Sequence, residues 1–284
     1  MKSARLLTLF CALALVVFSP WTRADDPAAS ANKLKDLVAR QKAVFADAGK
    51  AGAKLDEDNL RSQLQQICND YDVLLRKNPG YVPAYVAYAL LLGKVDNRKD
   101  ALALLLKANQ IDKNLPVVKN QLGNYLAEEG HPVEAMNYYL DAIKLAPKEP
   151  LYHYQLGTLL TEARSEFIKT GLWTRAQLDK SMQDAFRQAT LNAPDDWRYA
   201  YRYGLSFYDL EVGEGEAALQ FWQAFEQTLK PGVEQQTCRL HQAKVLAELR
   251  RYDEARVILA SVSDPVLAKQ KEKLVAELAA SPTK

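Results

Sequence analysis

The sequence predicts an all-α fold in which pairs of helices stack side by side, and three observations support this prediction. Small residues recur at fixed places within apolar helical segments, as Gly123, Ala135 and Ala142 do in residues 116–149. The same arrangement returns about 34 residues earlier and, less regularly, further along the chain. No alternation of apolar and polar residues is sustained after residue 24, so strands are not expected. A chain of 284 residues, 48% of them hydrophobic, is also too long for one small core.

The first 24 residues are expected to be a secretory signal peptide that is cleaved after Ala24. Lys2 and Arg5 precede an apolar run over residues 6–18, and a small residue closes the segment. An uncleaved anchor is the alternative, but this run is shorter than the roughly 20 residues that span a bilayer. Cys11 lacks the small residues before it that mark a lipoprotein cleavage site. The sequence therefore predicts an exported chain, periplasmic or secreted, with no membrane insertion after cleavage.

The charge of the mature chain excludes some classes of partner. Removing Lys2, Arg5 and Arg23 leaves 34 basic against 35 acidic side chains, so the net charge changes from +2 to −1. A near-neutral chain gives no electrostatic reason to expect nucleic acid or an anionic membrane as a partner. Two cysteines remain, Cys68 and Cys238, four repeats apart. That separation exceeds the ~6 Å between Cα atoms that a disulfide requires, so buried free thiols are expected.

The first element after the signal peptide, residues 25–81, is expected to be a helix pair that ends near Pro79. Ile67, Tyr71 and Leu74 of its second helix stand where the second helices of the later units carry their apolar residues. Its first helix carries almost no repeat signature, which is typical of the end unit of an array.

The next two units, residues 82–115 and 116–149, match one pattern closely. In the second, Leu122, Gly123 and Leu126 lie on the first helix, Ala135, Tyr139 and Ala142 lie on the second, and Pro147 ends the unit. In the first, the corresponding positions hold Tyr85, Ala89, Leu92, Ala101, Leu105 and Ala108. This pattern resembles the tetratricopeptide repeat, which is a helix-turn-helix unit of about 34 residues. The resemblance implies a right-handed α-solenoid in which the small residues mark helix crossings.

Three further units are less regular. Residues 150–196 carry Gly157 and then Phe186 and Ala189, with about 13 extra residues between the helices, a break at Gly171 and Thr174 as the cap of the second helix. In residues 197–231 we expect Gly204 on the first helix and Ala217, Phe221 and Ala224 on the second. Residues 232–264 carry Ala243, Ala255, Leu259 and Val262. Residues 265–284 are expected to form a C-terminal capping helix and tail, with Val266, Leu267, Leu274, Val275 and Leu278 near one face.

No catalytic or metal-binding arrangement is found in the sequence. His131, His153 and His241 have no second ligand at helical spacing, so they are expected to be surface or groove residues, and no metal site or cofactor is predicted. No phosphate-binding loop and no nucleophile elbow occur. The sequence therefore does not predict an enzyme.

The resemblance implies a concave groove, lined by the first helices, that receives an extended peptide or a helix of a partner. Offsets from each Gly or Ala give the groove positions Val86, Leu90, Asn120, Asn124, Glu128, Tyr154, Thr158, Arg198, Tyr201, Arg202, Leu205, Tyr208 and Lys244, with Glu162, Leu240 and Glu248 beside them. Tyr201 and Tyr208 are expected to be exposed to a ligand. Arg and Tyr are enriched at binding hot spots, and the alternative is a merely solvated inner face.

A narrower hypothesis comes from the same resemblance. Some members of the family hold a C-terminal carboxylate of the partner between side chains of three successive units. Here the corresponding positions are Asn120, Asn124, Gln155, Arg198 and Arg202, with Asn120 in place of a Lys and Gln155 in place of an Asn. Two arginines could bind a carboxylate, but arginines one turn apart are also common on helix surfaces.

The sequence thus predicts a non-enzymatic adaptor or scaffold that binds a protein or peptide in the bacterial cell envelope. One alternative is an accessory subunit of an envelope enzyme or secretion complex. Another is a structural protein that assembles with itself through Leu172 and Trp173 of the third-unit insertion. The oligomeric state is left open.

Overall fold

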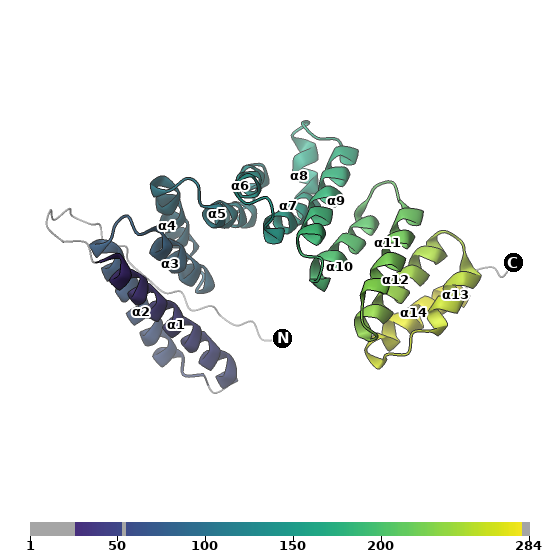
Figure 1. The fold of residues 1–284 in the computed structure, drawn as a ribbon, viewed down its shortest axis with the longest axis horizontal. Helices are drawn as coiled ribbons and strands as arrows, with labels where there is room; N and C mark the ends of the chain where they lie inside the picture. The colour runs from purple at the N-terminus through teal and green to yellow at the C-terminus, as the bar shows by residue number, and fades with distance from the viewer. Residues whose placement is uncertain (1–25, 53–54, 280–284) are drawn as a thin grey trace. The chain divides into compact units, whose positions relative to one another are not determined.

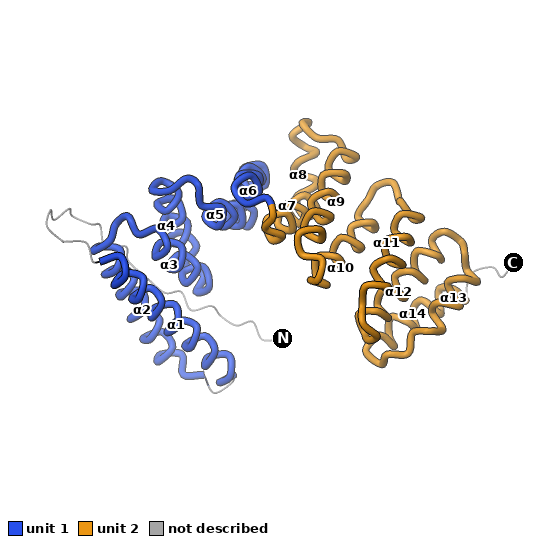
Figure 2. Tube along the Cα trace, in the orientation of Figure 1, with its two compact units in different colours: residues 1–147 blue, residues 148–284 orange. Residues whose placement is uncertain are grey.

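The computed structural model describes residues 26–52 and 55–279, which form helices joined by turns and loops and contain no strand (Figure 1). The all-α prediction is therefore confirmed for this part of the chain. The predicted signal peptide, residues 1–24, lies outside it. The chain divides into two compact units, residues 1–147 and 148–284, which are described separately (Figure 2).

The first unit consists of three helix pairs. Proline lies in the first turn of α1, α3, α5 and α6, where its missing N–H costs no hydrogen bond. The helices are α1 (Pro27–Ala51), α2 (Glu57–Lys77), α3 (Val82–Lys94), α4 (Arg98–Ile111), α5 (Pro116–Glu128) and α6 (Pro132–Leu145). Each odd-numbered helix packs against the next one, so the pairing follows the chain.

The N-terminal pair shares a core with the pair that follows it. Ile67, Tyr71 and Leu74 of α2 are buried, as the sequence predicts. The Tyr71 ring stacks on Tyr88 of α3 with 5.0 Å between centroids. Both rings belong to a cluster that continues through Leu105 to Leu122. The core is thus continuous from α1 to α5.

The second unit contains the insertion and the C-terminal helix. Its elements are α7 (Pro150–Glu162), α8 (Arg164–Lys169), α9 (Arg175–Asn192), α10 (Trp197–Ser206), the 3-10 turn η2 (Phe207–Asp209), α11 (Gly215–Thr228), α12 (Val233–Glu248), α13 (Tyr252–Ala260), the 3-10 turn η3 (Pro265–Leu267) and α14 (Ala268–Ala279). Helix α7 pairs with α9, while α12 packs on both α11 and α13. Helix α14 packs on α12 and α13.

The insertion forms a short extra helix, α8, and lengthens α9. Gly171 ends this segment with φ at +70°, a conformation that favours glycine. Thr174 caps α9, because its hydroxyl accepts from Gln177 N at 3.2 Å while the Gln177 side chain accepts from Thr174 N at 2.9 Å. The predicted break and cap are both confirmed.

A buried carboxylate ties the insertion to the loop that precedes α11. Asp179 Oδ1 lies 2.8 Å from Arg175 Nε and 3.4 Å from Arg164 Nη2. Its other oxygen accepts from Glu211 N at 2.8 Å. Both arginines also donate to the carbonyl of Asp209. The ion pairs and hydrogen bonds therefore hold three segments of the second unit together.

The small residues lie at helix crossings, as the sequence predicts. Ala101, Ala135 and Ala255 are fully buried. A Cβ atom added to Gly123 would lie 2.7 Å from the Tyr139 ring, and one added to Gly157 would lie 2.7 Å from the Phe186 ring. Separations this short are well inside van der Waals contact, so only glycine permits these crossings.

Two predictions of which helix residues face the core are wrong. On α11 the buried residues include Ala218, Trp222 and Phe225, each one place later than expected, whereas Ala217 and Ala224 are exposed. The physical reason is that α11 begins only at Gly215, after a loop with one more residue than expected. At the C-terminus Leu267, Leu274 and Leu278 are buried, but Val266 and Val275 are exposed because each lies one place from a buried leucine, about 100° around the helix.

The two cysteines in the described residues, Cys68 and Cys238, are buried thiols that are not joined in a disulfide, as predicted. Burial raises the pKa of the Cys238 thiol to about 12, so it stays protonated at neutral pH. Among the described helices, none has the length and apolar character needed to cross a bilayer.

Candidate ligand-binding site

The predicted groove residues divide between the two units, so each group is considered within its own unit. In the first unit, Leu90 is exposed and Val86 packs against the core. Glu128 ends α5, and its Oε2 lies 2.7 Å from Arg98 Nη1 at the surface. These three residues do not form a polar recognition surface.

The two asparagines predicted for the groove in the first unit require a correction. Asn120 is only 1% exposed, since it lies one turn before Gly123 on the same helix face and therefore points toward the packed side of α5. Asn124 Oδ1 accepts a hydrogen bond from the Tyr139 hydroxyl at 2.7 Å. Asn120 cannot reach a ligand, and Asn124 serves a contact between the two helices of its pair.

The two arginines of the hypothetical carboxylate site also bind other side chains of the protein. Arg202 Nη2 donates to Thr161 Oγ1 at 3.1 Å and to Asp209 Oδ2 at 3.0 Å, and its guanidinium lies 4.1 Å from the Phe186 centroid. Arg198 Nη2 lies 2.6 Å from an oxygen of Asp196 at its own helix start. Arg202 is therefore part of the fold rather than a free binding group.

Other predicted residues of the second unit also make internal contacts. The hydroxyl of Thr158 donates to the Tyr154 carbonyl at 3.0 Å, and the Tyr154 ring meets Phe186 edge-on. Leu205 is half-buried against the core. Tyr208 is half-buried as well, and its hydroxyl lies 3.2 Å from His241 Nδ1.

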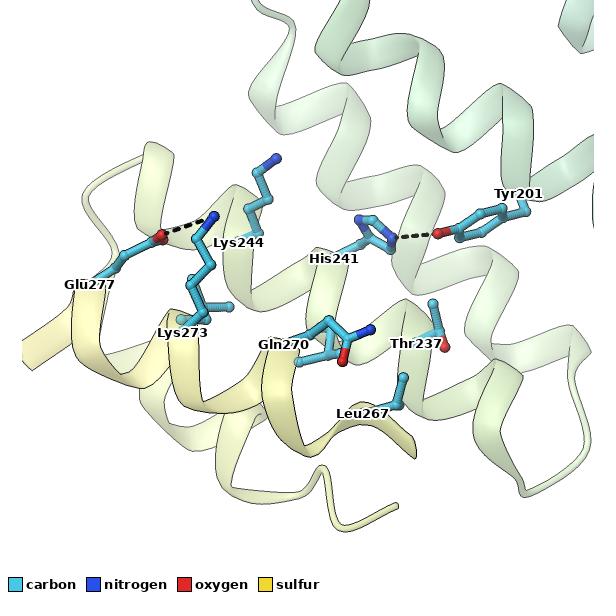
Figure 3. A pocket seen from close by; sticks show the side chains of 10 residues that line it. Tyr201, Thr237, His241, Lys244, Leu267, Gln270, Lys273 and Glu277 are labelled. Atoms are coloured by element: carbon cyan, nitrogen blue, oxygen red, sulfur yellow. Dashed lines mark hydrogen bonds and ion pairs between the residues drawn. The ribbon is translucent and has the colours of Figure 1, made fainter. Parts of the chain in front are cut away.

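One open pocket in the second unit brings Tyr201 and Lys244 together (Figure 3). It has a volume of about 290 Å³. Helix α12 supplies one wall from four residues at helical spacing, and α14 and the turn before it supply the opposite wall. The lining residues are Tyr201, Thr237, Leu240, His241, Lys244, Leu267, Gln270, Lys273, Leu274 and Glu277.

His241 sits between two tyrosines at one end of this pocket. Its Nδ1 lies 3.2 Å from the Tyr208 hydroxyl and its Nε2 lies 3.4 Å from the Tyr201 hydroxyl. The imidazole also stacks on Trp222, with ring centroids 4.3 Å apart. Burial, and then the charge of Lys244, lower the pKa of His241 to about 4. The ring is therefore neutral at pH 7, with one nitrogen able to donate and the other able to accept.

The charged side chains of the pocket lie at its mouth. Lys244 Nζ lies 3.9 Å from the Tyr208 centroid and 4.0 Å from Glu248. Lys273 Nζ lies 4.0 Å from Glu277. Figure 3 shows Lys273 and Glu277 on α14 and Lys244 on α12. Exposed ion pairs at such distances contribute little to stability.

Sequence reasoning found part of this pocket. It placed Tyr201, Lys244 and Leu240 on a ligand-facing surface, and the pocket contains all three. It missed Gln270, Lys273 and Glu277, because α14 carries no repeat signature and was interpreted only as a cap. Thr237 could have been found, since it shares one helix face with Leu240 and Lys244, and His241 is expected at the surface or in the groove.

The pocket is lined by groups that can bind a ligand. Among the described residues, no three His, Cys, Asp or Glu side chains gather as a metal site would require. His153, expected at the surface, is instead buried in α7. The pocket supplies an apolar floor, a neutral imidazole and two ammonium groups, which is a combination suited to holding a ligand.

No family model matches the chain, and no curated protein sequence matches it. Solved structures do resemble it. YrrB, described as a TPR protein with an unusual peptide-binding site, is 18% identical over 74% of this chain and 95% of its own, with a TM-score of 0.54.

Two further structures cover more of the chain. PilF of Pseudomonas aeruginosa is 17% identical over 88% of this chain and 99% of its own, with a TM-score of 0.55. PilW, described as a widely conserved type IV pilus biogenesis factor, is 12% identical over 89% of this chain and all of its own, with a TM-score of 0.57. At these identities the likeness concerns the fold. The protein has a TPR-type fold, as its repeat pattern predicts.

Proposed function

We propose that the protein is a non-enzymatic scaffold that binds a peptide or a partner protein in the bacterial cell envelope. The observation that carries this proposal is the open pocket formed by α10, α12 and α14. Its lining residues Lys244 and Gln270 are exposed, whereas His241 packs against Trp222. An exposed set of convergent polar and apolar groups is a feature of binding sites.

Two other observations support the proposal. The first 24 residues have the pattern of a secretory signal, which favours an envelope location. Solved structures of similar fold include one described with a peptide-binding site and one described as a pilus biogenesis factor. Repeat solenoids commonly bind partners on the surface that their repeats form.

In-cell crosslinking tests this function. A photoreactive amino acid replaces Gln270, which is exposed at the pocket, and in a control chain it replaces Val257, which is 73% exposed on α13 and does not line the pocket. We expect a discrete crosslinked partner from position 270 and none from position 257. If position 270 yields no product, or both positions yield the same products, the scaffold proposal loses its support.

Self-assembly is a second candidate, because one apolar side chain of the insertion is unusually exposed. Leu172 is 76% exposed, whereas Trp173 packs edge-on against Phe167 with 6.5 Å between centroids. Only Leu172 is thus free to meet a second copy. Light scattering of the Leu172→Ser variant and of the unchanged chain distinguishes the cases: a mass that rises with concentration only in the unchanged chain favours self-assembly, and a constant single-chain mass excludes it.

A further inference from the structure

The pocket of the second unit separates apolar and charged groups by depth. Leu240, Leu267 and Leu274 line it and are each less than a tenth exposed. Lys244, Gln270, Lys273 and Glu277 line it as well and are exposed. A ligand must therefore place apolar surface against the leucines while its polar groups stay near the mouth.

The size of the pocket limits what can enter. A volume of about 290 Å³ lies at the lower end of the range for small-molecule pockets. It is roughly ten times the ~30 Å³ that a water molecule occupies in the liquid. One large side chain with its backbone fits such a space, whereas a folded surface does not. The pocket thus favours an extended segment that inserts a single residue.

The charges at the mouth favour an acidic neighbour for that residue. Two lysines and one glutamate line the pocket, and the imidazole between them is neutral at pH 7. The pairs Lys244–Glu248 and Lys273–Glu277 are both 4.0 Å long and exposed, so exchange with a ligand carboxylate costs little. A basic segment would instead meet these two lysines, with Glu277 as the one carboxylate among the lining residues.

The wall that receives the ligand is rigid before binding. His241 is fixed by the hydroxyls of Tyr201 and Tyr208 and by stacking on Trp222. On the other side, Lys271 Nζ donates to the Val262 carbonyl, and Arg256 Nη2 donates to the Leu278 carbonyl at 2.9 Å, which holds α14 in place. A wall ordered in advance does not lose conformational entropy when the ligand binds.

We propose that this pocket binds one large apolar side chain, such as phenylalanine or leucine, from an extended acidic peptide segment. The carboxylate next to that side chain lies at the mouth beside Lys244 and Lys273. Helix α14 is then half of the binding site as well as the end of the array. This inference rests on the proposed scaffold function and names the chemistry of its partner.

Matched synthetic peptides test the inference on the full chain. Three fluorescein-labelled peptides with amidated C-termini share a Gly-Ser background and differ only in a central pair, Phe-Asp, Ala-Asp or Phe-Lys. Fluorescence anisotropy measures their affinities. We expect the Phe-Asp peptide to bind about tenfold tighter than the Ala-Asp peptide, because the leucines bury the ring. It should bind roughly fivefold or more tighter than the Phe-Lys peptide.

Charge reversal supplies the matched variants. The double variant Lys244→Glu, Lys273→Glu should prefer the Phe-Lys peptide. The control double variant Lys180→Glu, Lys269→Glu changes the net charge equally at exposed positions outside the pocket and should keep the original preference. Circular dichroism verifies that all chains are equally helical. All four side chains are exposed, so these variants should fold.

The results distinguish failure of the proposed ligand chemistry from failure of the proposed scaffold function. Equal binding of the Phe-Asp and Ala-Asp peptides, or a preference that the pocket double variant leaves unchanged, overturns the inference. So does the absence of any peptide binding. If position 270 still crosslinks a partner in cells in any of these cases, the scaffold function stands without this ligand chemistry. If it does not, both fail.

Discussion

Gly204 provides the sharpest test of how the helices of the second unit approach each other. A Cβ atom at this position would lie 2.4 Å from two atoms of the Trp222 ring and 2.6 Å from Phe221. Trp222 is fully buried and is confined by His241, whose ring stacks on it at 4.3 Å, and by Phe221 at 5.3 Å. The ring therefore cannot move away without displacing its neighbours.

The expected effect of Gly204→Ala is the difference between two terms. Overpacking of a filled core costs about 1–3 kcal/mol, and a site confined on several sides lies at the upper end of that range. Alanine in place of glycine within a helix stabilises it by about 1 kcal/mol. We therefore expect Gly204→Ala to lower the free energy of unfolding by about 1–2 kcal/mol.

Gly49→Ala is the matched control, because it measures the gain in helix stability from alanine without any steric contact. Gly49 lies in the last turn of α1, and nothing lies within 4 Å of a Cβ atom added to it. This variant should be unchanged or more stable by up to about 1 kcal/mol. Urea unfolding followed by far-UV circular dichroism measures both variants. Fluorescence adds a report on the second unit, because Trp173, Trp197 and Trp222 all lie there.

The reasoning is refuted if Gly204→Ala is as stable as the unchanged chain or more stable. That result would mean that the Trp222 ring gives way, so the crossing would not require glycine. An equal change in stability for Gly204→Ala and Gly49→Ala would contradict the argument in the same way, since only the Cβ atom at position 204 would meet a neighbouring ring.

Three further predictions concern a cap, a buried ion pair and a titration. Thr174→Ala should destabilise the second unit by about 1 kcal/mol in urea unfolding, because the capping box of α9 is lost; no change would contradict the cap. Asp179→Ala should cost about 3–5 kcal/mol in the same assay, since Arg164 and Arg175 lose their buried partner, and a loss below 1 kcal/mol would show that water replaces it. Burial lowers the pKa of His241 to about 4, below the ordinary 6.5, so its contribution to stability is complete above pH 6.5 and declines as the pH falls toward 4. NMR titration of the imidazole should show it neutral at pH 5.5, and a midpoint at 6.5 or above would be inconsistent with its burial.

Much of the fold could be predicted because small residues at helix crossings leave a clear trace in the sequence. Ala101, Ala135 and Ala255 are all fully buried at the expected places. The register of α11 could not be predicted in the same way. Its helix begins with Gly-Glu-Ala-Ala, and both Ala217 and Ala218 are small enough for a crossing. Only the packing of the Trp222 ring decides between them.

The candidate site was less predictable, because its groups come from segments with different sequence signals. Lys244 and Tyr201 follow from their offsets within a repeat. Lys273 and Gln270 lie on α14, where only the apolar positions carry a pattern, so their place beside Lys244 depends on tertiary packing. Asn120 shows the opposite error, since a position that the resemblance assigns to a ligand is buried here.

Hydrogen exchange of the full chain, with and without a saturating amount of the Phe-Asp peptide, tests the central claim most directly. The claim is that the face shared by α12 and α14 binds an extended peptide. We predict slower exchange in residues 237–244 and 267–277, with no change across α1 to α4. Protection confined to the first unit, or to the insertion around α8, would contradict the assignment of the binding site.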